Sequence, residues 1–189
     1  MKRYNLRKKY VLIIAIIIIG ILVYYLNISH INNSVQVLKD EYKNEFITKT
    51  GRIEKQLVGK EIKSLKHIIR KYNSYNIVLL YSGINCGNCN KKAFGLIKAI
   101  DSLSNRNLTT VVAYNSDTSY DSIIFDYKNF IFLDEKQSIR KELNYILTPV
   151  LLLIDKNSKI YSVYFPSLYT DHADDEKFLN LVKKQLSDI

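Results

Sequence analysis

The chain contains only two cysteines, Cys86 and Cys89, and the residues between them are Gly87 and Asn88. At this spacing the two sulfurs can meet within one helical turn. One thiol can then attack a disulfide, and the other can resolve the mixed disulfide that forms. The chemistry that these residues suggest is thiol-disulfide exchange.

The cysteines are expected where a strand turns into a helix. An apolar run at 77–81 is typical of a strand buried on both faces, and Ser82-Gly83-Ile84-Asn85 breaks it. After the pair, apolar residues recur at helical spacing (Phe94, Ile97, Ile100 and Leu103). A helix start favours negative charge, which lowers the pKa of the first thiol. We therefore predict Cys86 as the nucleophile and Cys89 as the resolving thiol.

Other uses of the pair are less well supported. A structural zinc site needs four ligands, and the three histidines of the chain, His30, His67 and His172, are widely scattered. A purely structural disulfide would close a very short loop and constrain the unfolded chain little. A peroxidatic cysteine of the peroxiredoxin type would need a threonine and a proline where this chain has Gly83 and Leu79. No metal or cofactor is predicted.

The remaining pattern predicts an α/β domain. Strands are expected at 108–114, 130–133, 150–154 and 159–165, helices at 139–143 and 174–186, a polar turn through Asp117 and Asp121, and a hairpin turn at 155–158. Thr148-Pro149 directly precedes an apolar strand, and a cis peptide bond would explain a proline there.

From about Leu57 to the C-terminus the chain resembles the thioredoxin-like superfamily, particularly the membrane-tethered TlpA/ResA-like thiol-disulfide oxidoreductases. The matching segments are LVGKEI, NIVLLYSGINCGNC and FIFLDEKQSIRKELNYILTPVLLLIDKNSKIY. The resemblance implies a central mixed sheet flanked by helices. It also implies that Thr148 and Pro149 lie beside the cysteines as the substrate platform, and that apocytochromes are one possible substrate class.

Several positions depart from the family pattern. Asn85 replaces the usual tryptophan, Leu80 replaces a frequent buried carboxylate, and Lys92 stands where the family often has glutamate. No acidic residue occurs between Glu61 and Asp101, so a proton relay must come from distant sequence or from water. Lys91 and Lys92 are expected to be solvated charges on a helix face. Near the sulfurs, they would stabilise a thiolate.

The N-terminal region predicts a membrane anchor. Residues 1–10 carry five basic side chains, and Val11 to Leu26 is an uncharged apolar run that ends in Tyr24, Tyr25 and Leu26. No small-residue cleavage pattern and no lipoprotein cysteine follow. The expected organisation is a basic cytoplasmic tail at 1–10, a single-pass signal anchor in the lipid bilayer at 11–26 and an extracytoplasmic remainder.

Residues 27–56 are expected to link the anchor to the domain at 57–189. Val35, Leu38, Tyr42 and Phe46 have helical spacing, which predicts a short amphipathic helix interrupted at Gly51. A turn or short strand is expected around Gly59, and a second helix at 62–72.

Charge argues against a nucleic-acid partner. The net charge of +10 lies in the N-terminal part, because residues from Tyr72 onward include 13 basic and 13 acidic side chains. A neutral domain lacks the basic surface that polyanions require.

Two hypotheses follow. In the first, the chain exchanges disulfides with exported proteins outside the bacterial inner membrane and is reset by a redox partner in the membrane or periplasm. In the second, it is a membrane-tethered binding module in which the cysteines only staple the helix start.

Overall fold

The computed structural model describes residues 2–69, 74–83, 86–103, 108–114, 127 and 131–187, with side chains described from Ile17 to Leu186 within these ranges. The chain divides into two compact units, Met1–Ile47 and Thr48–Ile189. The expected turn through Asp117 and Asp121 and the position of Asn85 lie outside the described residues.

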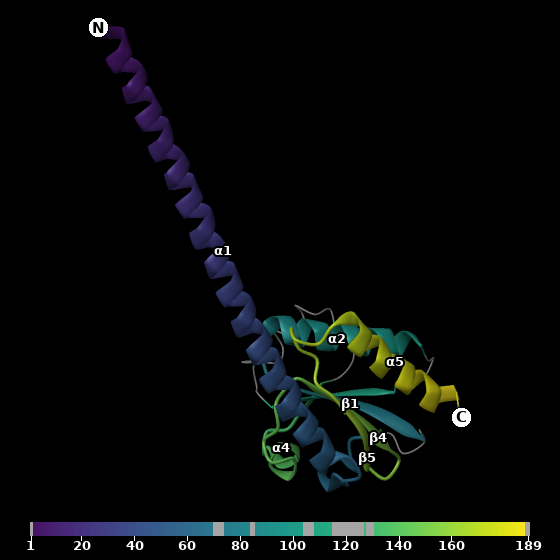
Figure 1. The fold of residues 1–189 in the computed structure, drawn as a ribbon. Coiled ribbons are helices and arrows are strands. Elements are labelled where there is room, and N and C mark those ends of the chain that lie inside the picture. Colours follow the sequence, from purple (N-terminus) through teal and green to yellow (C-terminus); the bar gives the residue numbers. More distant parts are fainter. Residues whose placement is uncertain are drawn as a thin grey trace. The chain divides into compact units, whose positions relative to one another are not determined.

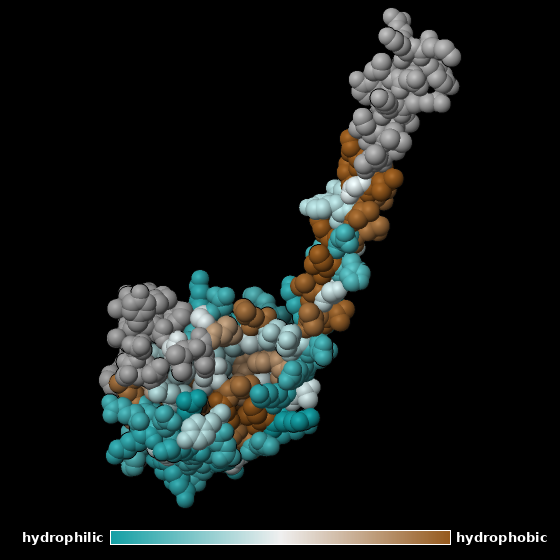
Figure 2. All heavy atoms as spheres, turned by 90° about the vertical axis from the view of Figure 1, so that its left-hand side faces the viewer, coloured by the Kyte–Doolittle hydropathy of each residue, from teal (hydrophilic) through white to brown (hydrophobic). Residues whose placement is uncertain are grey.

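The first unit is the N-terminal part of one long helix, α1 (Lys2–Leu57). The apolar side chains from Ile17 to Leu26 are half or more exposed, and Figure 2 shows hydrophobic surface along this stretch. Within the residues whose side chains are described, no helical stretch is both long and apolar enough to cross a membrane. The expected span at 11–26 lies partly outside that set, because the side chains of 11–16 are not described.

Two predictions for the region after the anchor are wrong. The helix is not interrupted at Gly51, because glycine in the interior of a helix costs only about 1 kcal/mol. It ends at Leu57, and Gly59 follows with a φ of +87°, a conformation that glycine adopts easily. The described part of 62–72 contains only a 3-10 turn, η1 (Lys63–Leu65), at whose start the Glu142 carboxylate accepts hydrogen bonds from the backbone N–H groups of Lys63 and Ser64.

The second unit contains a five-stranded mixed sheet in the order β3-β2-β1-β4-β5. Strands β1 (Tyr75–Tyr81), β2 (Thr109–Ala113) and β3 (Ile131–Leu133) run parallel to one another. Strands β4 (Val150–Asp155) and β5 (Ile160–Tyr164) form an antiparallel hairpin, and β4 pairs antiparallel with β1. The hairpin turn occurs as predicted, with the Asp155 carboxylate accepting from the N–H groups of Asn157 and Lys159.

Helices cover both faces of the sheet. Figure 1 shows α2 (Gly87–Ser102) and α5 (His172–Ser187) together on one face and α4 (Ser138–Glu142) on the other side. The main core lies under α2 and α5, where Phe94 packs edge-to-face against the rings of Tyr81 and Tyr127. The three inner strands of the sheet are β2, β1 and β4. Because successive strand residues point to alternate faces, these strands also bury side chains on the face opposite α2 and α5. This arrangement is the thioredoxin-like fold that the sequence predicts.

Candidate active site

The cysteine pair lies at the start of α2, as the sequence predicts. Cys86 is the N-cap residue of the helix, and its Sγ accepts a hydrogen bond from the backbone N–H of Cys89 at 3.2 Å. The two residues are joined as a disulfide, with their Cα atoms 5.2 Å apart. Cys86 is exposed and Cys89 is half-buried. Of the two sulfurs, that of Cys86 is therefore the more accessible to another protein.

The position of Cys86 also favours a thiolate once the disulfide is reduced. The N–H groups of the first helical turn have no partners within the helix and point toward the cap. The N–H that now reaches the Cys86 sulfur would donate to a negatively charged sulfur more strongly than to a neutral one. The helix dipole acts in the same direction.

The strand register places the proline at the same edge of the sheet as the cysteines. Leu80 near the end of β1 pairs with Val150 at the start of β4, and Pro149 directly precedes Val150. The Thr148–Pro149 peptide bond is cis, the isomer expected from the sequence. Pro149 is buried and Thr148 is half-buried. The contact of these two residues with the cysteines stays a prediction.

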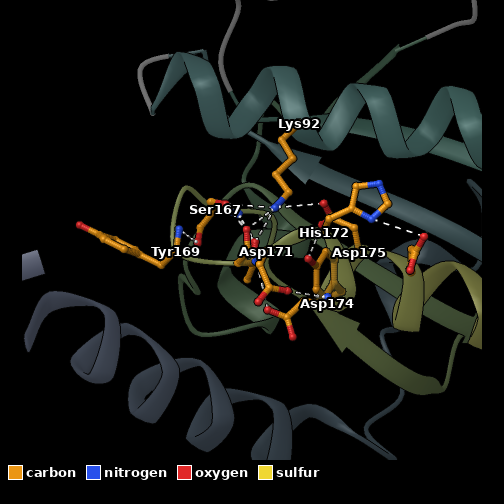
Figure 3. Close-up of polar contacts among 10 residues, drawn as sticks. Lys92, Ser167, Tyr169, Asp171, His172, Asp174 and Asp175 are labelled. Atoms are coloured by element: carbon orange, nitrogen blue, oxygen red, sulfur yellow. Dashed lines mark hydrogen bonds and ion pairs between the residues drawn. The ribbon is translucent and has the colours of Figure 1, made fainter. Parts of the chain in front are cut away.

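The loop after β5 reaches this edge too, and Lys92 of α2 binds it (Figure 3). The Lys92 Nζ donates to the carbonyl oxygens of Ser167 (3.3 Å) and Thr170 (2.6 Å) and to the Thr170 hydroxyl (2.9 Å). It also forms an ion pair with Asp175 of α5 at 3.1 Å. We call residues 167–170 together with Lys92 and Asp175 the lysine latch.

The latch corrects one expectation and supports another. Lys91 is exposed, as expected. Lys92 is not a solvated helix-face charge, because its side chain is only 22 % exposed and its charge is paired with that of Asp175. The spacing of residues along the helix does not predict these contacts of Lys92. Asp175 lies 83 residues further along the chain, and Ser167 and Thr170 contribute mainly backbone oxygens.

Asp175 has a second partner, the Tyr164 hydroxyl, which donates to its Oδ1 at 2.5 Å. Burial, helped by this hydrogen bond, raises the pKa of Tyr164 well above its usual value. The phenol therefore remains a hydrogen-bond donor at neutral pH. The outward-facing end of the loop is apolar, because Leu168 and Tyr169 are exposed, and in Figure 3 the Tyr169 ring points away from Lys92 and Asp175.

A buried amide lies directly after the resolving cysteine. The Asn90 side chain is 1 % exposed, and its Nδ2 donates to the carbonyl oxygen of Ser82 at 3.0 Å, tying α2 to the end of β1. Its Oδ1 has no hydrogen-bond partner among the described residues. Sequence reasoning missed this residue, although a polar side chain on the apolar face of the helix was a visible signal.

Comparisons with known proteins agree with the fold. No protein-family model and no curated protein matches the sequence. Among solved structures, a DsbE-type thiol:disulfide interchange protein from Chlorobium tepidum is 19 % identical with a TM-score of 0.50, covering 61 % of this chain and 82 % of that one.

Two other solved structures are more distant. A secreted disulfide oxidoreductase of Mycobacterium tuberculosis is 12 % identical, with a TM-score of 0.45 and coverage of 59 % of this chain and 81 % of that one. A 2-Cys peroxiredoxin of Plasmodium vivax is 17 % identical, with a TM-score of 0.43 and coverage of 71 % and 82 %. Likenesses at this level support no argument about chemistry. The thioredoxin-like fold and the disulfide-forming pair are consistent with an oxidoreductase.

Proposed function

We propose that this protein is a membrane-anchored thiol-disulfide oxidoreductase that acts on extracytoplasmic proteins through Cys86 and Cys89. The observation that carries the proposal is the placement of an exposed, disulfide-forming Cys86 as the N-cap of α2. A fold alone does not define an activity, and it is this placement of Cys86 that supports thiol-disulfide exchange.

The exchange proceeds in two displacements. The Cys86 thiolate of the reduced protein attacks one sulfur of a substrate disulfide, forming a mixed disulfide and releasing one substrate thiolate. The Cys89 thiolate then attacks the Cys86 sulfur, which releases the second substrate sulfur as a thiolate and leaves the Cys86–Cys89 disulfide; both substrate thiolates take up protons from solvent. The substrate gains two electrons, and the protein loses them. A redox partner in the membrane or periplasm returns the pair to its starting state.

Thr148 and Pro149 are proposed to align the substrate. They lie at the same sheet edge as the helix start, and the register of β1 and β4 fixes their position along that edge. An extended substrate segment there can pair with the backbone beside Thr148, which holds its cysteine in line with the Cys86 sulfur.

The proposed anchor is Val11 to Leu26. The chain is helical throughout this stretch, and the apolar side chains of its described part are exposed rather than packed in a core. A helix that is apolar on all sides is typical of a bilayer environment. Five basic residues before it favour retention of residues 1–10 in the cytoplasm, which places the domain outside.

Single-cysteine variants test the chemistry. Cys89→Ser keeps the attacking thiol but removes the group that releases the product, so it is expected to accumulate mixed disulfides with exported proteins. Cys86→Ser is the matched control and is expected to trap little. Non-reducing gels of cells treated with acid and alkylating agent measure both. Equal trapping would overturn the assignment of roles.

The competing function is a tethered binding module with a structural disulfide. It predicts that the purified protein neither reduces nor oxidises any protein disulfide and that neither variant traps a partner. Topology is tested separately by adding protease to spheroplasts. Digestion of the domain is expected, and a protected full-length band would contradict the proposed orientation.

A further inference from the structure

A cavity of about 290 Å³ lies within the second unit, between the end of α1 and the segment that leads to the cis-proline. Residues from Lys49 to Lys60 form one side, and residues 143–147 form the other. We call it the basic pocket. Its volume is near the lower limit of roughly 300 Å³ for ligand pockets, which suits one or two side chains better than a cofactor.

The pocket adjoins the proposed substrate platform along the chain. Leu147 lines the pocket and is followed directly by Thr148 and Pro149. We therefore expect a polypeptide aligned along Thr148 to reach the pocket with side chains that lie close to its reactive cysteine. Small disulfides would not extend that far.

One wall of the pocket is held in an uncommon backbone conformation. Asn144 and Tyr145 both have positive φ values, 54° and 53°, which are sterically costly for residues with a Cβ. The Tyr145 ring lies 5.3 Å from the guanidinium carbon of Arg140, which also lies 5.2 Å from the ring of Tyr114. Backbone strain of this kind is concentrated at functional sites, and here it fixes a half-exposed aromatic ring at the pocket wall.

The charged residues that line the pocket are all basic. Its ten lining residues include two lysines and no acidic residue, and the segment 48–69 has six basic residues against two acidic ones. Lys60 donates to the Glu142 carbonyl oxygen and lies close enough to the Glu142 carboxylate to lower the pKa of that group. Lys49 has no ion pair with a described carboxylate. It is the cation available to a bound partner.

We infer that the basic pocket selects the substrate polypeptide. It takes an apolar side chain of the substrate against Ile53 and Tyr145, and Lys49 binds a carboxylate next to that side chain. This inference rests on the proposed function and specifies its substrate class, namely cysteines flanked by an apolar and an acidic residue.

Three peptides that contain one intramolecular disulfide test the inference. They differ only in the two residues before the first cysteine, which are Leu-Glu, Leu-Lys or Ser-Glu. The full-length protein is reduced, freed of reductant and mixed with each peptide, and the second-order rate of its oxidation is followed. The Leu-Glu peptide is expected to react about fivefold faster than Leu-Lys and about tenfold faster than Ser-Glu.

Charge reversal then identifies the lysine. Lys49→Glu is expected to invert the preference, so that the Leu-Lys peptide reacts faster than Leu-Glu. Lys55→Glu makes the same change in net charge on an exposed residue of the same helix that does not line the pocket, and it should keep the wild-type preference. Ile53→Ser should abolish the preference for leucine over serine.

A short neutral disulfide separates failure of the inference from failure of the proposed function. Bis(2-hydroxyethyl) disulfide reports the exchange chemistry without reaching the pocket. If the wild-type protein reduces it but reacts equally with all three peptides, the pocket does not select substrate and the inference is wrong. If the protein reduces nothing, the proposed function itself fails. If Lys49→Glu, but not Lys55→Glu, instead changes the oligomeric mass, the pocket joins two copies of the chain and the inference is overturned.

Discussion

Removing the Lys92 ammonium should loosen the unit that carries the cysteines. The change Lys92→Met keeps most of the aliphatic stem and deletes three hydrogen bonds and one ion pair. A hydrogen bond to a charged group contributes about 1.5–3 kcal/mol, and breaking a fully buried ion pair costs about 3–5 kcal/mol. Here both side chains keep some contact with solvent, at 22 % and 18 % exposure, so the cost is lower. We expect a loss of about 2–3 kcal/mol in the free energy of unfolding.

The assay is urea unfolding of the purified disulfide form, followed by near-UV circular dichroism of tyrosine because the chain has no tryptophan. For a unit of this size the loss corresponds to a fall in melting temperature of about 6–9 °C. The matched control is Lys91→Met, which changes the preceding, exposed residue. It should lower the free energy of unfolding by less than about 0.5 kcal/mol. A double-mutant cycle with Asp175→Asn should give a coupling energy above about 1 kcal/mol. Equal stability of the two methionine variants would refute the reasoning.

Three further predictions concern stability. Burial opposes ionisation of Glu142, but the N–H groups of Ser64 and Lys63 and the charge of Lys60 outweigh burial and lower the pKa of the carboxyl group. The ionised Glu142 therefore stabilises the fold fully above its ordinary pKa, and this stabilisation is lost as the pH falls through the lowered pKa. Glu142→Gln should therefore be less stable than wild type at pH 7, and urea titrations should show this difference shrinking below about pH 4.5. Phe94→Ala removes a ring packed against two others and should cost about 3–5 kcal/mol in urea unfolding. Tyr164→Phe keeps the stacking on Phe178 but deletes the bond to Asp175, so thermal unfolding should show a loss of about 1–3 kcal/mol.

The elements that sequence reasoning located are those with strong local signals. Continuous apolar runs marked β1 and β4, and the Asp155 turn marked the hairpin that follows. Cys86 was placed at a helix start because a break and then an apolar repeat surround it. The resemblance to a known family supplied an expectation that local patterns lack, namely that Thr148 and Pro149 lie beside the cysteines.

The misses have physical causes that a single sequence does not reveal. Gly51 was predicted to interrupt the helix because glycine is intrinsically unfavourable there. Helix formation is cooperative, however, so the long helical sequences on both sides of Gly51 offset this cost. The segment after Ile62 has helical spacing but forms only a 3-10 turn, and the start of that turn is held by a tertiary contact with Glu142, 79 residues from Lys63. The partners of Lys92 are likewise distant, and two of them are backbone carbonyls, which any residue type could provide.

The latch bears on how the cysteines are activated. Two consecutive lysines after the pair suggested a positive field at the sulfurs, but the charge of Lys92 is balanced by Asp175, and Lys91 is exposed to a solvent that screens it. Stabilisation of a Cys86 thiolate must then come chiefly from the start of α2, through the Cys89 N–H and the helix dipole, because these groups are fixed in place and act at short range. Lys92 contributes in a different way. By holding residues 167–170 against the same helix, it fixes where the exposed Leu168 and Tyr169 stand relative to Cys86. Under the proposed function, Lys92 is thus a positioning residue for the surface around the site, and the exchange chemistry depends on the helix start.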